Sequence, residues 1–119
     1  MKKLFAVVAV ALATVASAQA PPAVESITVS TTAVSLAAAT IGGGTTGKPE
    51  ARYCFLSLAT AAIRWRADGI APDTNTGHIM ASGSALELYG ATTIRRFSAI
   101  RDDAADGILT VSCWESEPF

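Results

Sequence analysis

The sequence contains a single histidine, His78, and this scarcity limits the chemistry that the chain can carry out. A histidine-rich metal site is excluded, and a Ser-His-Asp triad would have to be built around His78. No serine lies in the G-x-S-x-G pattern of a nucleophile elbow. We therefore expect His78, which follows a turn, to be a partly exposed structural residue, and we expect a protein without enzymatic activity or cofactor.

An excess of charge of one sign is also missing, since the formal net charge is −1. Nucleic acids and anionic membranes attract proteins through positive charge, so we expect no nucleic-acid partner. Aromatic residues make up only 7% of the chain, and much of its apolar content is alanine. The core must therefore be built from Ile, Leu and Val, together with a few aromatic residues: Tyr53, Phe55, Trp65, Tyr89, Phe97 and Trp114.

The apolar run near the N-terminus extends from Leu4 to Val15 and is too short to cross a bilayer as a helix. It follows Lys2-Lys3 and precedes the small residues 16–18, which is the pattern of a secretory signal. We expect residues 1–18 to be a signal peptide, or otherwise an uncleaved N-terminal apolar arm or helix. Residues 19–24 are expected to form a linker, and cleavage would leave no stable membrane anchor.

Cysteine occurs only twice, at Cys54 and Cys113. In an exported chain these residues could form a disulfide, which would stabilise the fold by about 4 kcal/mol in the loop-entropy treatment. Each cysteine shares a strand face with leucine or valine, so both also fit the pattern of small buried hydrophobic residues. The sequence leaves both interpretations open.

After the linker, short segments rich in alternating or β-branched residues are separated by turn residues every eight to twelve positions. We predict an all-β domain over 25–119, an antiparallel β-sandwich or jelly-roll-like barrel of seven or eight strands. The alternative is an open barrel with one helix covering an end. The expected strands are 25–30, 33–37, 52–59, 62–66, 78–81, 85–89, 94–101 and 108–115, with 52–59 central.

Segment 94–101 is ambiguous, because Ile94, Phe97 and Ile100 would also form a helical stripe. We favour a strand, since helix caps are missing and the neighbouring segments all have strand patterns. The segment 62–69 is clearer, because it alternates and then enters an Asp-Gly turn. It predicts Ile63 and Trp65 in the core, with charged residues on the opposite face.

Two loops resemble ligand sites only superficially. Residues 42–48 match G-x-x-x-x-G-K, but Pro49 stands where a phosphate-binding loop needs a hydroxyl, so we expect a flexible loop between strands. Asp102, Asp103 and Asp106 precede a glycine, but their spacing differs from that of a calcium loop. We interpret this second segment as a solvated turn.

Five arginines could form a basic patch if strands 62–66 and 94–101 are neighbours: Arg64, Arg66, Arg95, Arg96 and Arg101. Such a patch could bind carboxylates, a phosphate-rich polymer or a neighbouring subunit. The interpretation that we favour is pairing on a solvated face with nearby acids, namely Asp68, Glu87, Asp102 and Asp103.

The segment ATAAIRWRADGIAPD at 59–73 is similar to an "ETAPIRYRxDGTAPT" type of segment, and later residues such as 76–79 and 86–88 continue the likeness. Over nearly all of its length after the leader, the chain resembles small proteins encoded among the structural genes of tailed bacteriophages. The resemblance implies a compact β-domain associated with virions and without catalytic residues. Two features depart from that group, the signal-like leader and the two cysteines.

We therefore expect a non-catalytic structural or interaction module, located in a virion, whose partners are other protein subunits of the virion or further copies of the chain. The alternative is an exported β-sandwich module of the periplasm or the extracellular space. In that case the turns at one end of the sandwich would bind carbohydrate or protein.

Overall fold

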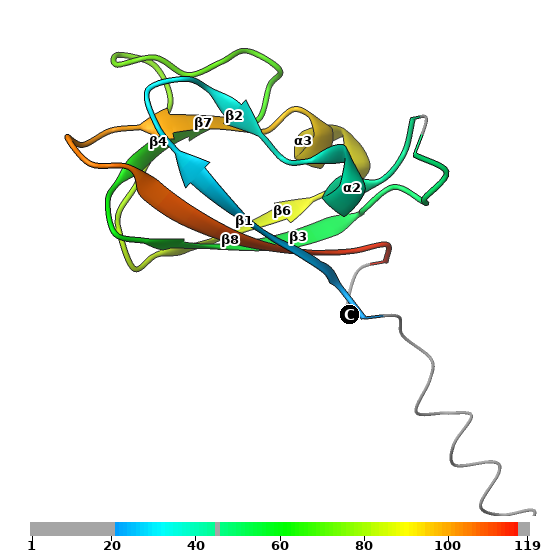
Figure 1. The fold of residues 1–119 in the computed structure, drawn as a ribbon. Helices are drawn as coiled ribbons and strands as arrows, with labels where there is room; N and C mark the ends of the chain where they lie inside the picture. Colours follow the sequence, from blue (N-terminus) through cyan, green and yellow to red (C-terminus); the bar gives the residue numbers. More distant parts are fainter. Residues whose placement is uncertain (1–20, 45, 117–119) are drawn as a thin grey trace, which may run out of the picture.

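The computed structural model describes residues 21–44 and 46–116. The expected signal peptide at 1–18 and the start of the expected linker lie outside the described residues. Within the described ranges the fold is mostly β, and two four-stranded antiparallel sheets face each other (Figure 1). No helix in these ranges is long and apolar enough to cross a membrane.

Each sheet combines strands from distant parts of the sequence. The first sheet has the order β1 (Ala23–Val29), β8 (Gly107–Trp114), β3 (Tyr53–Ala59) and β6 (Ala85–Tyr89). The second has the order β2 (Val34–Ser35), β7 (Ser98–Arg101), β4 (Ile63–Arg66) and β5 (His78–Met80). The central position of β3, between β8 and β6, confirms the prediction for 52–59.

The strands pair from the two ends of the chain inward: β1 with β8, β2 with β7, β3 with β6 and β4 with β5. Two further ladders join β3 to β8 and β4 to β7, and all six ladders are antiparallel. Except for β4 and β5, consecutive strands lie in opposite sheets. The chain therefore crosses repeatedly from one sheet to the other. The antiparallel ladders confirm the predicted all-β antiparallel fold.

The core lies between the sheets because each strand directs alternate side chains inward. In the first sheet, β3 and β8 bury the residues Cys54, Leu56, Leu58, Leu109, Val111 and Cys113. In the second sheet, β4 buries Ile63 completely, and Ala99 of β7 is also fully buried. These side chains form one continuous apolar cluster, as a small domain requires.

The prediction of a continuous strand over 94–101 is wrong in its first half. Residues Ala91–Arg95 form the short helix α3, and only Ser98–Arg101 form strand β7. Phe97 follows the helix and donates its N–H to the carbonyl of Ile94 at 3.4 Å, and both side chains are only 1% exposed. Of the stripe Ile94, Phe97 and Ile100, only Ile94 lies in the helix, since Phe97 follows it and Ile100 belongs to β7. Burial of Ile94 and Phe97 stabilises the turn without a side-chain cap.

Two boundaries also differ from the expected ones. Strand β1 begins at Ala23, inside the expected linker, because its pairing with β8 continues to Cys113. The expected strand 33–37 is reduced to Val34–Ser35 and is followed by helix α2 (Ala38–Ile41), which buries Thr40 and Ile41. The alanine-rich sequence supports a helical turn here, since alanine is the best helix former.

Candidate functional site

The segment with the most specific sequence, β4 and the turn after it, borders an open groove of about 450 Å³. Its lining comes from two segments, residues 65–68 and residues 76–78, which lie side by side because β4 pairs with β5. We call this feature the Trp65 groove. A groove of this volume has the size of a typical small-molecule site.

Trp65 and His78 form the aromatic side of the groove. They are paired across β4 and β5, and their ring centroids are 4.8 Å apart. The indole of Trp65 also stacks on Phe97, at a centroid distance of 5.9 Å, so it is fixed against the core. Trp65 packs against the core as predicted but is only partly buried, whereas Ile63 is fully buried, which confirms its predicted place in the core.

The charged side of the groove is a bidentate pair between Arg66 and Asp68. The Arg66 Nε donates to Asp68 Oδ1 at 3.0 Å, and Nη2 donates to the other carboxylate oxygen. The guanidinium holds the pKa of the Asp68 carboxyl below its ordinary value. The Asp68 carboxylate also accepts the backbone N–H of Ile70, so it fixes the turn as well as the arginine.

Arg64 supports the groove from behind, on the outer face of the second sheet. Its Nη2 donates to Asp102 Oδ1 at 2.9 Å, and its Nη1 donates to the carbonyl of Gly77 at 3.3 Å. Gly77 has φ +136°, and a Cβ there would lie 2.7 Å from Arg64 Cγ. The close contact therefore requires glycine, and Arg64 ties the 76–78 segment to the turn after β7.

The five arginines do not form one patch. The strand pairing of β4 with β7 places Arg101 on the same face as buried Ile63, and Arg64 and Arg66 on the other. Arg101 pairs with Asp106 at 2.8 Å, and Arg95 pairs with Glu50 at 2.9 Å. Arg96, at the end of α3, is exposed, and no carboxylate among the described residues pairs with it.

The acids that the sequence analysis paired with these arginines are only partly the right ones. Asp68 and Asp102 form the expected ion pairs, whereas Asp103 caps the next backbone N–H, at 2.7 Å. Glu87 accepts a hydrogen bond from the hydroxyl of Tyr53 instead, at 2.6 Å. Within the described ranges, no group of three acids, cysteines or histidines is arranged to hold a metal ion.

Lys48, the last residue of the G-x-x-x-x-G-K match, is bound to the chain itself. Its Nζ donates to the carbonyl of Ala39 in α2 at 2.7 Å. The helix precedes the glycines, whereas a phosphate-binding loop precedes its helix and directs N–H groups outward. The described residues of the segment, 42–44 and 46–48, form a loop as predicted, but it joins helix α2 to strand β3 rather than two strands.

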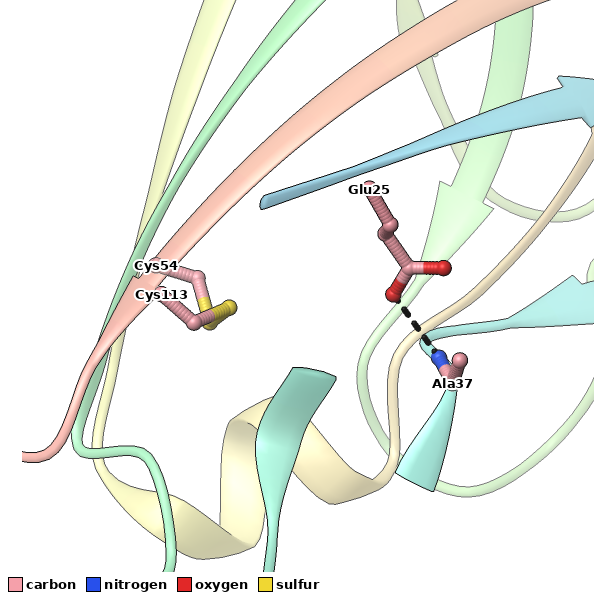
Figure 2. Close-up of a disulfide and its surroundings, with 4 residues drawn as sticks. All are labelled: Glu25, Ala37, Cys54 and Cys113. Carbon is pink, nitrogen blue, oxygen red and sulfur yellow. Dashed lines mark hydrogen bonds between the residues drawn. A yellow bond between two sulfur atoms is a disulfide. The ribbon is translucent and has the colours of Figure 1, made fainter. Parts of the chain in front are cut away.

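Cys54 and Cys113 form a disulfide across directly opposite positions of β3 and β8, with Cα atoms 4.1 Å apart. Both residues are also almost completely buried. They therefore form a disulfide and at the same time occupy buried apolar positions, so both interpretations of the sequence apply. Figure 2 shows the disulfide between β3 and β8, with Glu25 of β1 pointing toward Ala37, just before α2. The Glu25 carboxylate accepts the N–H of Ala37 at 2.9 Å, which joins the edge strand to the start of the helix.

The outer face of the first sheet has a composition that the sequence analysis did not single out. By strand alternation it carries fourteen side chains, of which Glu87 alone is charged: Val24, Ser26, Thr28, Tyr53, Phe55, Ser57, Ala59, Ala85, Glu87, Tyr89, Ile108, Thr110, Ser112 and Trp114. We call this surface the low-charge face. The outward-facing positions of these four strands contain no lysine, arginine or aspartate, and this pattern can be read directly from the sequence.

Aromatic residues gather at one end of the low-charge face. Tyr53 lies between Tyr89 and Trp114, at ring-centroid distances of 5.2 and 5.3 Å. Tyr53 is only 5% exposed, and its hydrogen bond to Glu87 raises the pKa of its hydroxyl to about 12. Beside this cluster, Val24 is 60% and Phe55 39% exposed.

Comparisons of the chain with known protein families, with curated proteins and with solved structures find no match.

Proposed function

We propose that the chain is a non-catalytic virion-associated module with a jelly-roll β-sandwich fold, which docks against other protein subunits through its low-charge face. The strand orders β1-β8-β3-β6 and β2-β7-β4-β5 support the jelly roll, because this fold is a long hairpin wound into two facing sheets. Viral capsid domains use this architecture. That link is an analogy of fold, so the docking surface carries the functional argument.

The proposal rests on the exposed apolar side chains of the low-charge face, whose strand positions include a single charged residue, Glu87. An outer sheet face that meets only water normally alternates with charged and strongly polar residues. Here Val24, Phe55 and Tyr89 are 60%, 39% and 43% exposed on one face. These side chains lie in neighbouring rows of the sheet, with Ser112 between Val24 and Phe55, and exposed apolar residues grouped on one face mark sites of protein contact. The other outer face also exposes an apolar side chain, Ile79 at 61%, but there it lies beside Arg64 and near Arg66, each of which is paired with an acid.

The resemblance of 59–73 to phage structural proteins supports the same function from an independent part of the chain. That segment forms β4 and the following turn, on the sheet opposite to the low-charge face. Apart from Ala59 and Glu87, which the likeness also includes, the quoted segments lie away from the residues proposed for docking. The likeness indicates that the assembly is a virion, whereas the low-charge face indicates which surface of the chain contacts the other subunits.

Lysine substitutions test the docking surface. Val24→Lys and Phe55→Lys place a charge on the low-charge face at exposed positions, so the fold should be retained. We expect each to reduce the fraction of chain that co-sediments with purified particles by tenfold or more, because a buried unpaired charge disfavours an interface. Ile70→Lys is the matched control, since Ile70 is 57% exposed in a loop of the other sheet. Wild-type incorporation of both test variants would refute docking through this face.

A second candidate function is an exported binding module of the periplasm or extracellular space. The observation that favours it is the Cys54–Cys113 disulfide, since disulfides persist in oxidising compartments. Mass spectrometry of purified particles and of culture medium separates the two candidates. Detection of the chain in particles supports the virion function, whereas a processed soluble chain found only in the medium would replace it with the exported one.

A further inference from the structure

The Trp65 groove is a second surface, on the other sheet from the low-charge face, and docking of the first sheet would leave it open. It is lined by Trp65, Arg66, Ala67, Asp68, Thr76, Gly77 and His78. Aromatic, hydroxyl, imidazole and paired charged groups therefore converge on one groove of about 450 Å³. Such a mixture of a flat apolar wall and a few polar groups is typical of a small-molecule site.

The aromatic wall is rigid. The Trp65 indole is held by its stacking on Phe97, which is 1% exposed, and by its contact with the His78 ring. A ligand that packs on this indole would therefore not have to order a mobile side chain, which removes one cost of binding. A ligand that packs on a fixed aromatic surface needs a flat face made of apolar C–H groups.

The polar wall presents hydrogen-bonding groups with no net charge. Arg66 uses two nitrogens on Asp68, so the pair is neutral as a unit and offers remaining N–H donors beside carboxylate acceptors. The Thr76 side chain, which adds a hydroxyl, is exposed at the same groove. The neighbouring Asp68 carboxylate repels an anion from the remaining N–H groups of Arg66, whereas a hydroxyl can donate and accept at once.

We propose that the Trp65 groove binds one ring of a neutral saccharide. The C–H face of the sugar packs on the aromatic wall formed by Trp65 and the exposed ring of His78, and its hydroxyls exchange hydrogen bonds with the Arg66–Asp68 pair and with Thr76. A sugar ring is the common ligand class that combines an apolar face with a rim of donors and acceptors. This function is separate from docking, because the residues lie on opposite sheets.

The backbone around the groove is already held in place without a ligand. Asp73 Oδ1 accepts the N–H groups of Asn75 and Thr76 at 2.8 Å each, which fixes the turn that carries Thr76. Arg64 holds the next segment through the carbonyl of Gly77. Preorganisation of this kind keeps the polar groups in position when a ligand arrives.

The test is an NMR titration of the ¹⁵N-labelled full chain with glucose, galactose, mannose and N-acetylglucosamine, and with inorganic phosphate as the anionic probe. We expect at least one sugar to shift the Trp65 indole N–H and the amides of 66–68 and 76–78. Phosphate should leave these signals in place. If no sugar shifts these signals, or if phosphate shifts them as strongly as the sugars do, the proposal is wrong.

Two variants assign the polar and aromatic contributions. Asp68→Asn should weaken sugar binding about tenfold, because a hydrogen bond to a charged group is lost. Asp103→Asn is its matched control, since Asp103 is an exposed aspartate outside the groove lining. Trp65→Phe keeps an aromatic ring against Phe97 and should weaken binding while the chain stays folded. Equal weakening by Asp68→Asn and Asp103→Asn would show that the groove is not the site.

Discussion

Removal of the Cys54–Cys113 disulfide is the perturbation whose magnitude the structure defines best. The two cysteines face each other across β3 and β8 and are separated by 59 residues in the chain. The double variant Cys54→Ala/Cys113→Ala removes the covalent link and leaves the backbone pairing of the two strands in place. Both side chains are buried, at 0% and 3% exposure, so alanine keeps the site apolar.

The expected loss follows from the loop that the disulfide closes. A link across 59 residues lowers the conformational entropy of the unfolded chain and stabilises the fold by about 4 kcal/mol at 25 °C. A domain of this size has a free energy of unfolding of about 5 to 15 kcal/mol, so the link is a large share of the total. With a urea slope of about 1 to 2 kcal/mol per molar, the unfolding midpoint should fall by about 2 to 4 M.

Urea unfolding, followed by tryptophan fluorescence and by circular dichroism, measures this loss in the oxidised wild-type chain and the double variant. Reductant provides the control. Because the sulfurs are buried, the wild-type chain should be unfolded with reductant and then refolded with reductant present, after which its midpoint should match that of the variant. Reductant should leave the variant unchanged. A difference below about 1 kcal/mol between oxidised wild type and variant would refute the entropic reasoning.

Three further perturbations test individual contacts. Glu87→Ala removes the hydrogen-bond acceptor that raises the Tyr53 pKa to about 12, so alkaline absorbance titration should show this pKa falling toward its ordinary value of about 10; an unchanged value would contradict the cause given. Backbone N–H groups hold the Asp73 pKa below its ordinary value, so the turn's stabilisation should be present above about pH 4 and lost as pH falls through the lowered pKa; amide exchange at 75–76 that stays constant in acid would contradict this. Gly77→Ala strains a residue at φ +136° against Arg64 and should lower stability by about 1 to 3 kcal/mol in urea unfolding; an unchanged midpoint would show that the contact is adaptable.

The alternation of side chains was sufficient to predict most of the strands. Residues 53–59 and 107–114 carry apolar residues at every second position, and burial of these positions is what holds the two sheets together. The sequence was less informative about α3. There Ile94 and Phe97 fit a helix and a strand equally well, and contact with the rest of the core decided between them.

The two candidate surfaces depend on strand pairing, which a single sequence does not specify. The low-charge face joins four strands that lie as far apart in sequence as β1 and β8, and its composition appears only when these strands are placed in register. The Trp65 groove likewise depends on the pairing of Trp65 with His78. Local patterns could identify each strand, but they carry no information on its neighbours.

By itself the sequence determined the alternation, the turns and the choice of buried residues, because these depend on side-chain period and on local backbone preferences. It also identified the 59–73 segment as the most specific part of the chain. Only the tertiary structure decided that Cys54 and Cys113 are bonded and that the arginines are divided between two faces of the second sheet and α3. These outcomes depend on long-range register, in which a shift of one residue would turn every side chain to the opposite face.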